Sequence, residues 1–346
     1  MAHLPPSAVP DARILAAYVI FSASYVVFAL GKFPGLKIDR PGAAIIGAVT
    51  MVAFRIVKPG EAVRFIDFPT LVLLFSMMLI VGTLHLVGFF EWTAEMVLLR
   101  LKPSQLLLAV IFTSGVLSAF FVNDIVCLVM VPLVLTITRR LELKSVPYLL
   151  AVATASNIGS VATITGNPQN ILIGSFSRIS YRDFLLHLGP VALLGLLLDW
   201  LVLYCVHMRN MPHLAQASER IPLPPIDVSR LTKPALVVTA VVIAFFAGAA
   251  PAMAAALGAA VLLISRTLEP RKLYDEVDWG LLVFFVGLFL IVGGAENAGI
   301  VDEFLRFVQH WNLHRLAIFT VAVSLLSNIV SNVPAVMLLK SLVPNF

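Results

Sequence analysis

Long apolar segments follow one another along most of this sequence, and they limit the fold more than any other feature. A helix needs about 20 consecutive apolar residues to span a bilayer, and many of the segments approach that length. Hydrophobic residues make up 60% of the chain and charged residues only 12%, whereas soluble domains carry about 25% charged residues. The sequence therefore predicts an all-α polytopic membrane protein. The apolar segments run at 12–30, 41–57, 68–90, 106–138, 147–176, 188–208, 235–250, 253–265, 279–297 and 316–343.

The chain also resembles itself when it is shifted by 211 residues. "LIVGTLHLVGFFE" (79–91) then meets "LIVGGAENAGIVD" (290–302). Glycine, proline and acidic residues coincide at this one spacing, which indicates a duplication rather than chance matches among apolar helices. The matched pairs include Gly47 and Gly258, Pro59 and Pro270, Asp67 and Asp278, and, with a two-residue slip, Asn123 and Asn332.

The repeat divides the chain into four parts. Whether the two copies are inverted depends on 106–138, which holds two apolar arms around a polar tip. If this stretch enters the membrane and returns to the same side, an odd number of crossings separates the copies and inverts them; as a single crossing it would leave them parallel. We expect an N-terminal segment with the first transmembrane helix (1–34), followed by a first repeat (35–208) that contains a re-entrant hairpin (106–138) and a broken helix (147–176). A cytoplasmic linker (209–234) then leads to a second repeat (235–346), which has its own hairpin (316–345) and is incomplete at its C-terminus.

Orientation follows from lysine and arginine, which favour the cytoplasmic side of a membrane. In the inverted arrangement, the loops on one side of the membrane hold more lysine and arginine than the loops on the other side. The richer side receives the loops at 31–40, 98–105, 139–146, 209–234 and 266–278. We therefore expect an integral protein of the plasma (inner) membrane with its N-terminus outside the cytoplasm. The short segment 91–100 is amphipathic, which favours a place in the membrane interface.

The stretch 151–174, "AVATASNIGSVATITGNPQNILIG", is the most polar of the apolar segments. Gly159 and Gly166 permit unusual backbone angles, and Pro168 ends a helical hydrogen-bond ladder. Backbone without helical hydrogen bonds is tolerated at membrane depth only inside protein or along a wet cavity. A broken helix places one N-terminus and one C-terminus near the midplane, where they attract an anion and a cation. We favour a binding site here over a kinked helix packed by small residues.

Ionisable residues inside the apolar segments are few. Asp124 lies at the first hairpin tip, and a carboxyl in the bilayer must be protonated, paired or wet, so Asp124 is a candidate for proton coupling. Asp199 is a second candidate, with a structural hydrogen bond as an equal alternative. For His85 and Glu296, near helix ends, we expect snorkelling to the interface. Both cysteines fall in apolar segments, which predicts small buried residues rather than a disulfide.

Enzymatic motifs are not visible in the sequence. It contains no His-Glu-x-x-His, no Gly-x-Ser-x-Gly, no nucleotide-binding loop and no cluster with metal-ligand spacing. We expect a transporter without a cofactor, no nucleic-acid partner, and H⁺ or Na⁺ as the coupling ion.

Three segments resemble the signature segments of the ion transporter superfamily: "FFVNDIVCLVMVPLVLTITR" (120–139), "ATASNIGSVATITGNPQNILIG" (153–174) and "LLSNIVSNVPAVMLL" (325–339). This superfamily includes arsenite efflux permeases, plant-type silicon efflux transporters, sodium/proton antiporters, citrate–metal carriers and sodium-coupled dicarboxylate symporters. The resemblance implies two inverted repeats, a homodimer and an elevator-like motion. It places substrate and ion binding at Asn123, Asp124, Ser156, Asn157, Gly159, Thr163, Gly166 and Asn167, a sodium site at Asn123 and Gly159, and a second site at Ser331 and Asn332.

The two tips distinguish branches of the superfamily. The dicarboxylate symporters carry Ser-Asn-Thr at both tips, whereas the first tip here reads Val122-Asn123-Asp124. An Asn-Asp tip is similar to the metalloid-efflux and proton-coupled branches. This favours proton-coupled efflux of a small inorganic oxyacid or anion, with a sodium-coupled citrate or dicarboxylate symporter as the alternative. In the superfamily a second broken helix and a final span follow the second hairpin, so we expect further residues in the functional form.

Overall fold

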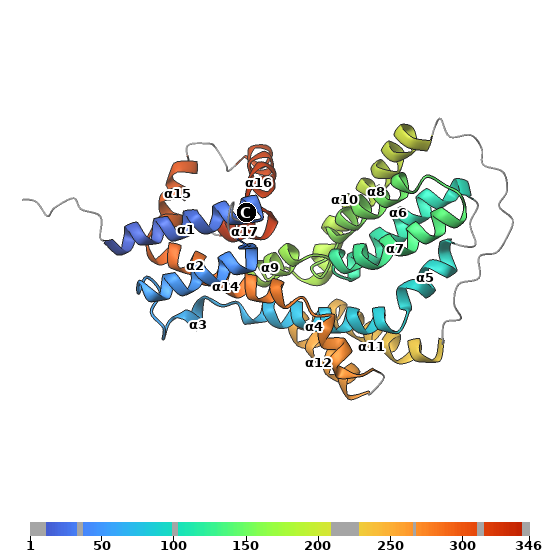
Figure 1. Cartoon of the computed structure of the whole chain (residues 1–346), viewed down its shortest axis with the longest axis horizontal. Coiled ribbons are helices and arrows are strands. Elements are labelled where there is room, and N and C mark those ends of the chain that lie inside the picture. The colour runs from blue at the N-terminus through green and yellow to red at the C-terminus, as the bar shows by residue number, and fades with distance from the viewer. Residues whose placement is uncertain are drawn as a thin grey trace, which may run out of the picture. The chain divides into compact units, whose positions relative to one another are not determined.

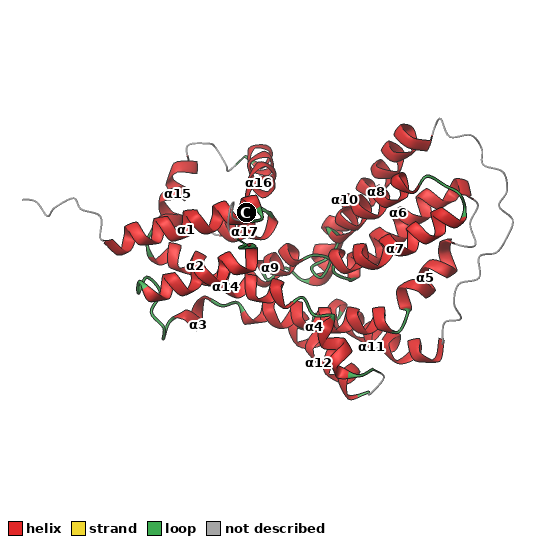
Figure 2. Cartoon of the chain, viewed as in Figure 1, coloured by secondary structure: helices red, strands yellow, loops and turns green. Residues whose placement is uncertain are grey.

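The computed structural model describes residues 12–32, 37–98, 103–208, 228–265, 268–309 and 315–340. Nearly all of these residues are helical, and no strand occurs among them (Figure 2). Among the described residues, five helices are long and apolar enough to cross a membrane: Ala12–Leu30, Phe68–Leu86, Tyr181–His207, Ser229–Phe246 and Trp279–Asn297. The predicted all-α membrane fold is thereby confirmed. The predicted linker 209–234 and N-terminal segment 1–34 fall partly outside the described residues.

The chain forms two compact units, of which the first is built from two segments far apart in the sequence and the second from one continuous segment (Figure 1). The first unit combines residues 1–71 with 278–346, and the second comprises 72–277. These units are a different division of the chain from the predicted repeats. The first unit holds α1 (Ala12–Leu30), α2 (Arg40–Ala53), α3 (Ala62–Phe65), α14 (Trp279–Asn297), α15 (Ile300–Gln309), α16 (Leu316–Val330) and α17 (Asn332–Leu339).

In the second unit, α8 is the central helix and packs against α6, α7 and α10. Small residues on α8, such as Gly159, allow its close approach to α6. The helix α4 (Phe68–Leu86) begins in the first unit and continues into the second. The rest of the second unit consists of α5 (Phe89–Leu98), α6 (Pro103–Phe120), α7 (Asn123–Arg140), α8 (Ser145–Ser160), α9 (Pro168–Ser177), α10 (Tyr181–Leu203), a π-helical turn (Tyr204–Met208), α11 (Val228–Phe246), α12 (Pro251–Ile264) and α13 (Pro270–Asp275).

Helix bounds recur at the offset seen in the sequence. The pairs α2 and α12, α4 and α14, and α5 and α15 begin and end 211 residues apart. The glycine before the third pair adopts a left-handed φ in both copies, +82° at Gly88 and +76° at Gly299. Only glycine adopts such angles readily, so the same turn is encoded twice. The inversion of the two copies stays a prediction.

Packing inside each unit follows the same offset. A Cβ added at Gly47 would lie 2.5 Å from Cδ1 of Ile291 in the first unit. In the second unit, a Cβ at Gly258 would lie 3.6 Å from Cδ1 of Ile80. Each glycine thus faces an isoleucine from the other copy of the repeat.

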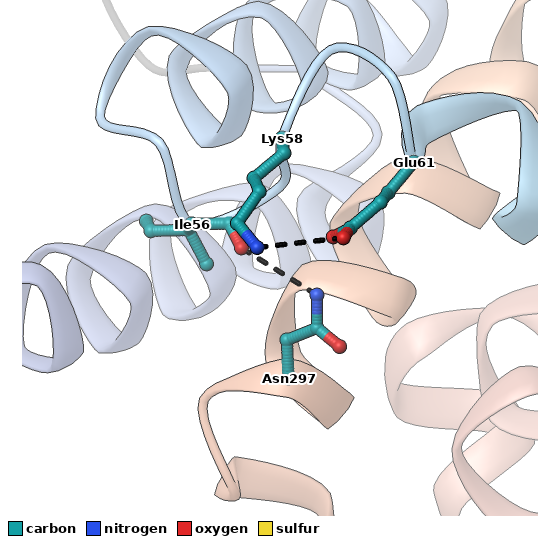
Figure 3. A network of polar contacts seen from close by, with 4 residues as sticks. All are labelled: Ile56, Lys58, Glu61 and Asn297. Carbon is teal, nitrogen blue, oxygen red and sulfur yellow. Dashed lines mark hydrogen bonds and ion pairs between the residues drawn. The ribbon is translucent and has the colours of Figure 1, made fainter.

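The loop before α3 is held against the end of α14 in the first unit (Figure 3). The side-chain amide of Asn297 donates to the carbonyl oxygen of Ile56 over 3.5 Å. In the same loop, Nζ of Lys58 lies 3.4 Å from Oε1 of Glu61. Both partners are largely exposed, so this ion pair contributes little to stability.

Candidate functional site

The break between α8 and α9, which the polar stretch in the sequence predicts, lies against the tip of the α6–α7 hairpin. The backbone N–H of Asn123 donates to the carbonyl oxygen of Gly166 over 3.0 Å. Its side-chain Nδ2 donates to Oδ1 of Asn157 over 3.1 Å. The residues of the hairpin tip and of the helix break therefore form one polar junction, which we call the tip–break junction (residues 114–127 and 154–170).

The start of α9 is specified by its first residues. Asn167 is the N-cap, and its Oδ1 accepts a hydrogen bond from the backbone N–H of Asn170 over 2.8 Å. Pro168 occupies the first turn, where its missing N–H leaves no hydrogen bond unmade. A Cβ added at Gly166 would lie 2.1 Å from the carbonyl oxygen of Ser160. Only glycine therefore allows the chain to double back on the end of α8.

Asn170 satisfies the carbonyl groups that the break leaves without helical partners. Its buried Nδ2 lies 3.1 Å from the carbonyl oxygen of Ser160, 3.4 Å from that of Val161 and 2.9 Å from that of Thr163. Backbone carbonyl groups that lack helical hydrogen bonds need such partners at membrane depth. The open backbone is thus held in a defined shape.

Two threonines in the break form hydrogen bonds to neighbouring helices. The hydroxyl of Thr163 donates to the carbonyl oxygen of Ala119 in the last turn of α6. The hydroxyl of Thr165 lies 2.9 Å from that of Tyr181 in α10. The break is therefore fixed to both the hairpin and the following span.

α6 and α8 approach at the level of their backbones. A Cβ added at Gly159 would lie 2.1 Å from the carbonyl oxygen of Gly115 and 2.4 Å from its Cα. Small residues permit such contact between membrane helices. This contact sets the distance between the hairpin and the broken helix.

Four helix ends converge on the tip–break junction. α6 ends at Phe120 and α8 at Ser160, while α7 begins at Asn123 and α9 at Pro168. Helix C-termini carry partial negative charge and N-termini partial positive charge. The junction therefore offers attraction to a cation and to an anion within one small region.

Three buried oxygens beside the junction have no hydrogen-bond partner among the described residues. They are Oδ1 of Asn123 and the hydroxyls of Ser114 and Ser118, one turn apart on α6. Unpaired buried polar atoms are rare and call for an explanation such as an ion or a ligand. Sequence reasoning missed both serines, although their four-residue spacing on α6 places them on one helix face.

The other predicted residues take varied positions around the junction. Ser156 is buried, and its hydroxyl lies 2.7 Å from Sγ of Cys127. Asp124 is exposed in the first turn of α7. Asp199 accepts a hydrogen bond from Thr154 over 2.9 Å, so it meets α8 one turn before Asn157.

The second predicted site belongs to the first unit. Ser331 separates α16 from α17 and has a φ of +78°, a strained value for a residue with a side chain. Asn332 begins α17 and is exposed. The hydroxyl of the buried Tyr25 donates to the carbonyl oxygen of Pro334 over 3.2 Å, so α1 supports this tip.

Some expectations from the sequence need correction. The snorkelling expected for His85 and Glu296 stays a prediction, and each has a side-chain partner that the sequence did not indicate: His85 Nδ1 lies 2.9 Å from Oε2 of Glu276, and Oε1 of Glu296 lies 2.8 Å from Lys340 Nζ. Both cysteines are free, as expected, but neither is buried: Cys127 is half-buried and Cys205 exposed. Asn170 and Tyr181 could not be predicted from the sequence, because their roles depend on contacts across the break.

Within the described residues, no three His, Cys, Asp or Glu side chains gather in a way that could hold a metal ion. The sodium site expected at Asn123 and Gly159 would instead use neutral oxygens, and it stays a prediction.

Comparison with known proteins places the chain in a family. The family model described as "Citrate transporter" (CitMHS) matches residues 25–345. The chain belongs to this family. Its members are membrane transporters, so the chain is a transporter rather than an enzyme.

Individual relatives agree with this assignment. The chain is 27% identical to the "Silicon efflux transporter LSI3" of Oryza sativa subsp. japonica, over 94% of this chain and 81% of the relative. It is 23% identical to the "Putative transporter arsB" of Dictyostelium discoideum, over 90% of this chain and 77% of the relative. Among solved structures, the YdaH transporter of Alcanivorax borkumensis, whose topology is described as unusual, superposes with a TM-score of 0.56 at 14% identity, covering 95% of this chain and 82% of that one. This last likeness concerns the fold alone.

Proposed function

We propose that this transporter exports a small inorganic oxyacid or anion, similar to arsenite or silicate, in exchange for protons by alternating access. The observation that carries the proposal is the tip–break junction, where four helix ends and unpartnered buried oxygens meet. Such helix ends at the midplane are typical of secondary transporters.

The chemistry of the junction suits a small, weakly charged solute. Its side chains are amides, hydroxyls and a thiol, with Asp124 as the acid at its edge. These groups exchange hydrogen bonds with the hydroxyls of an oxyacid. A multivalent carboxylate would instead favour arginine, which binds carboxylates through two parallel hydrogen bonds. The names of the silicon and arsB relatives support the same class of solute.

Asp124 is the proton-coupling group in this proposal. It sits in the first turn of α7, next to Asn123, whose backbone and side chain both bind the helix break. A carboxyl at this place gains or loses a proton as solute occupies the junction. Asp199 is the second candidate, because it reaches α8 through Thr154.

A second candidate function is sodium-coupled uptake of citrate or a dicarboxylate. The family description supports it, and so do the unpartnered oxygens of Asn123, Ser114 and Ser118. Neutral oxygens of this kind suit a dehydrated alkali cation. In either case we infer a homodimer in the plasma (inner) membrane with its N-terminus outside the cytoplasm.

The experiment that tests the proposal uses the purified chain in liposomes with an acidic interior. Arsenite, silicic acid, phosphate, citrate or sodium is added outside, and an internal dye reports the collapse of the pH gradient. We expect collapse with arsenite or silicic acid, and at least a tenfold slower collapse with Asp124→Asn. Sodium-dependent citrate accumulation without any proton movement would overturn the proton-coupled function and establish the second candidate.

A further inference from the structure

Tyr181, the first residue of α10, contacts both α11 and the helix break. Its side chain is buried, and the centroid of its ring lies 4.9 Å from that of Phe245 and 5.3 Å from that of Phe246. These phenylalanines are the last two residues of α11. Aromatic rings at such separations stabilise a contact beyond the burial of their surface. The end of α11 therefore holds the ring of Tyr181 in place.

The hydroxyl of Tyr181 is the first of three hydroxyls in a row along the helix break. It lies 2.9 Å from Oγ1 of Thr165, and Oγ1 of Thr165 lies 3.3 Å from Oγ1 of Thr163. The hydroxyl of Thr163 in turn donates to the carbonyl oxygen of Ala119, in the last turn of α6. The row thus extends from the end of α11 to the base of the hairpin tip.

The direction of donation along this row follows from its last bond. A hydroxyl has a single proton, and Thr163 gives its proton to the Ala119 carbonyl oxygen. Thr165 gives its own proton to Thr163 or to the carbonyl oxygen of Phe120, which lies 3.5 Å away. Thr165 therefore accepts from Tyr181, which is the first donor of the row. Hydrogen bonds linked in this way strengthen one another.

The segment that this row supports carries groups of the tip–break junction. Residues 161–167 lie between α8 and α9, outside both helices. Thr163 is one of the predicted solute-binding residues, and the carbonyl oxygen of Gly166 accepts a hydrogen bond from the backbone N–H of Asn123. The position of these groups therefore depends on side-chain contacts to neighbouring helices, and Tyr181 supplies the contact from α10.

We propose that Tyr181 is a positioning residue for the solute site. α11 holds its ring, and its hydroxyl sets the position of Thr163 and Thr165 in the tip–break junction. Tyr181 acts through Thr165 rather than by touching the solute, and it gives the end of α11 a part in solute binding. The inference rests on the proposed function, because it names a residue that shapes the proposed solute site.

The variant Tyr181→Phe separates the two contacts of this side chain. It keeps the ring against Phe245 and Phe246, so we expect it to fold, and it removes only the hydroxyl. Thr165→Val removes the partner hydroxyl, and the double variant completes a double-mutant cycle. Tyr204→Phe is the control, because it removes a hydroxyl from an exposed tyrosine in the π-helical turn that follows α10.

The first measurement needs no solute. It is the rate of methanethiosulfonate labelling at Cys127, whose Sγ lies 2.7 Å from the hydroxyl of Ser156 inside the junction. Loss of one hydrogen bond changes an equilibrium about fivefold, so we expect about fivefold faster labelling in Tyr181→Phe and in Thr165→Val, and no faster labelling in the double variant. Labelling of Tyr181→Phe at the rate of the parent, or labelling of the double variant about 25-fold faster, would overturn the inference.

The second measurement is the KM for arsenite in the liposome assay. We expect KM to rise about fivefold in Tyr181→Phe and in Thr165→Val, and no further in the double variant, while the maximal rate and the Tyr204→Phe control match the parent. A purely structural role would lower the maximal rate and leave KM unchanged, and that result would overturn the inference. If the parent moves no protons with arsenite, the export function fails, while the labelling rates still decide the role of Tyr181.

Discussion

At the scale of single residues, the site depends on glycines that have no room for a methyl group. Gly159 is the clearest case, because its Cα faces the backbone of Gly115. The neighbouring atoms are backbone atoms, which cannot rotate away as a side chain would. Any larger residue must push α6 and α8 apart.

Replacing Gly159 with alanine is therefore expected to destabilise the protein by about 1–3 kcal/mol, the usual range for overpacking, and to abolish transport. Thermal unfolding in detergent measures the first effect and the liposome assay the second. Gly60→Ala is the control, because nothing lies within 4 Å of a Cβ at that position. Equal melting temperatures for the two variants would contradict the close contact.

At the scale of elements, one side chain, that of Asn170, lies closest to the carbonyl groups that the helix break leaves without helical partners. The Nδ2 group of Asn170 reaches three carbonyl oxygens that a continuous helix would have satisfied internally. Asn167 and Pro168 then start the second half of the helix. The break is thus an ordered segment stabilised by its own hydrogen bonds.

Asn170→Leu keeps the volume of the side chain but removes these hydrogen bonds. Each unsatisfied buried carbonyl costs about 1–3 kcal/mol, so we expect a clear loss of stability together with loss of transport. The neighbouring Gln169→Leu, on a half-buried residue of the same helix, is the stability control and should retain the melting temperature of the parent. A fully active Asn170→Leu would show that the break does not need this residue.

Sequence patterns predicted the positions of the hairpin and the break, because glycine, proline and polar residues interrupt otherwise apolar segments there. They could not predict which side chains form hydrogen bonds with the residues of the break. Asn170 and Tyr181 act across the break, and the contacts of Thr163 with Ala119 and of Cys127 with Ser156 join segments that only the fold brings together. Helix bounds were predictable because the repeat encodes them twice.

At the scale of the whole molecule, an inverted repeat places equivalent loops of its two copies on opposite sides of the membrane. Glu61 and Lys272 are 211 residues apart; Lys272 is exposed, and the Glu61 side chain is 40% exposed. Cysteines at these two positions, in a background where Cys127 and Cys205 are serine, should react from opposite sides with a membrane-impermeant maleimide. An inverted repeat predicts that the position-61 cysteine is labelled in intact cells and the position-272 cysteine only after permeabilisation. Labelling of both from one side would show that the copies are parallel.

The central claim is that solute binds at the tip–break junction, and the two native cysteines test it directly. Sγ of Cys127 lies 2.7 Å from the hydroxyl of Ser156 inside the junction, whereas Cys205 is exposed in the π-helical turn after α10. The measurement is the rate of methanethiosulfonate labelling at each cysteine, followed by mass spectrometry with and without the transported solute. We predict that the solute slows labelling of Cys127 at least tenfold and leaves Cys205 unchanged. Equal labelling rates of Cys127 with and without solute would contradict the account.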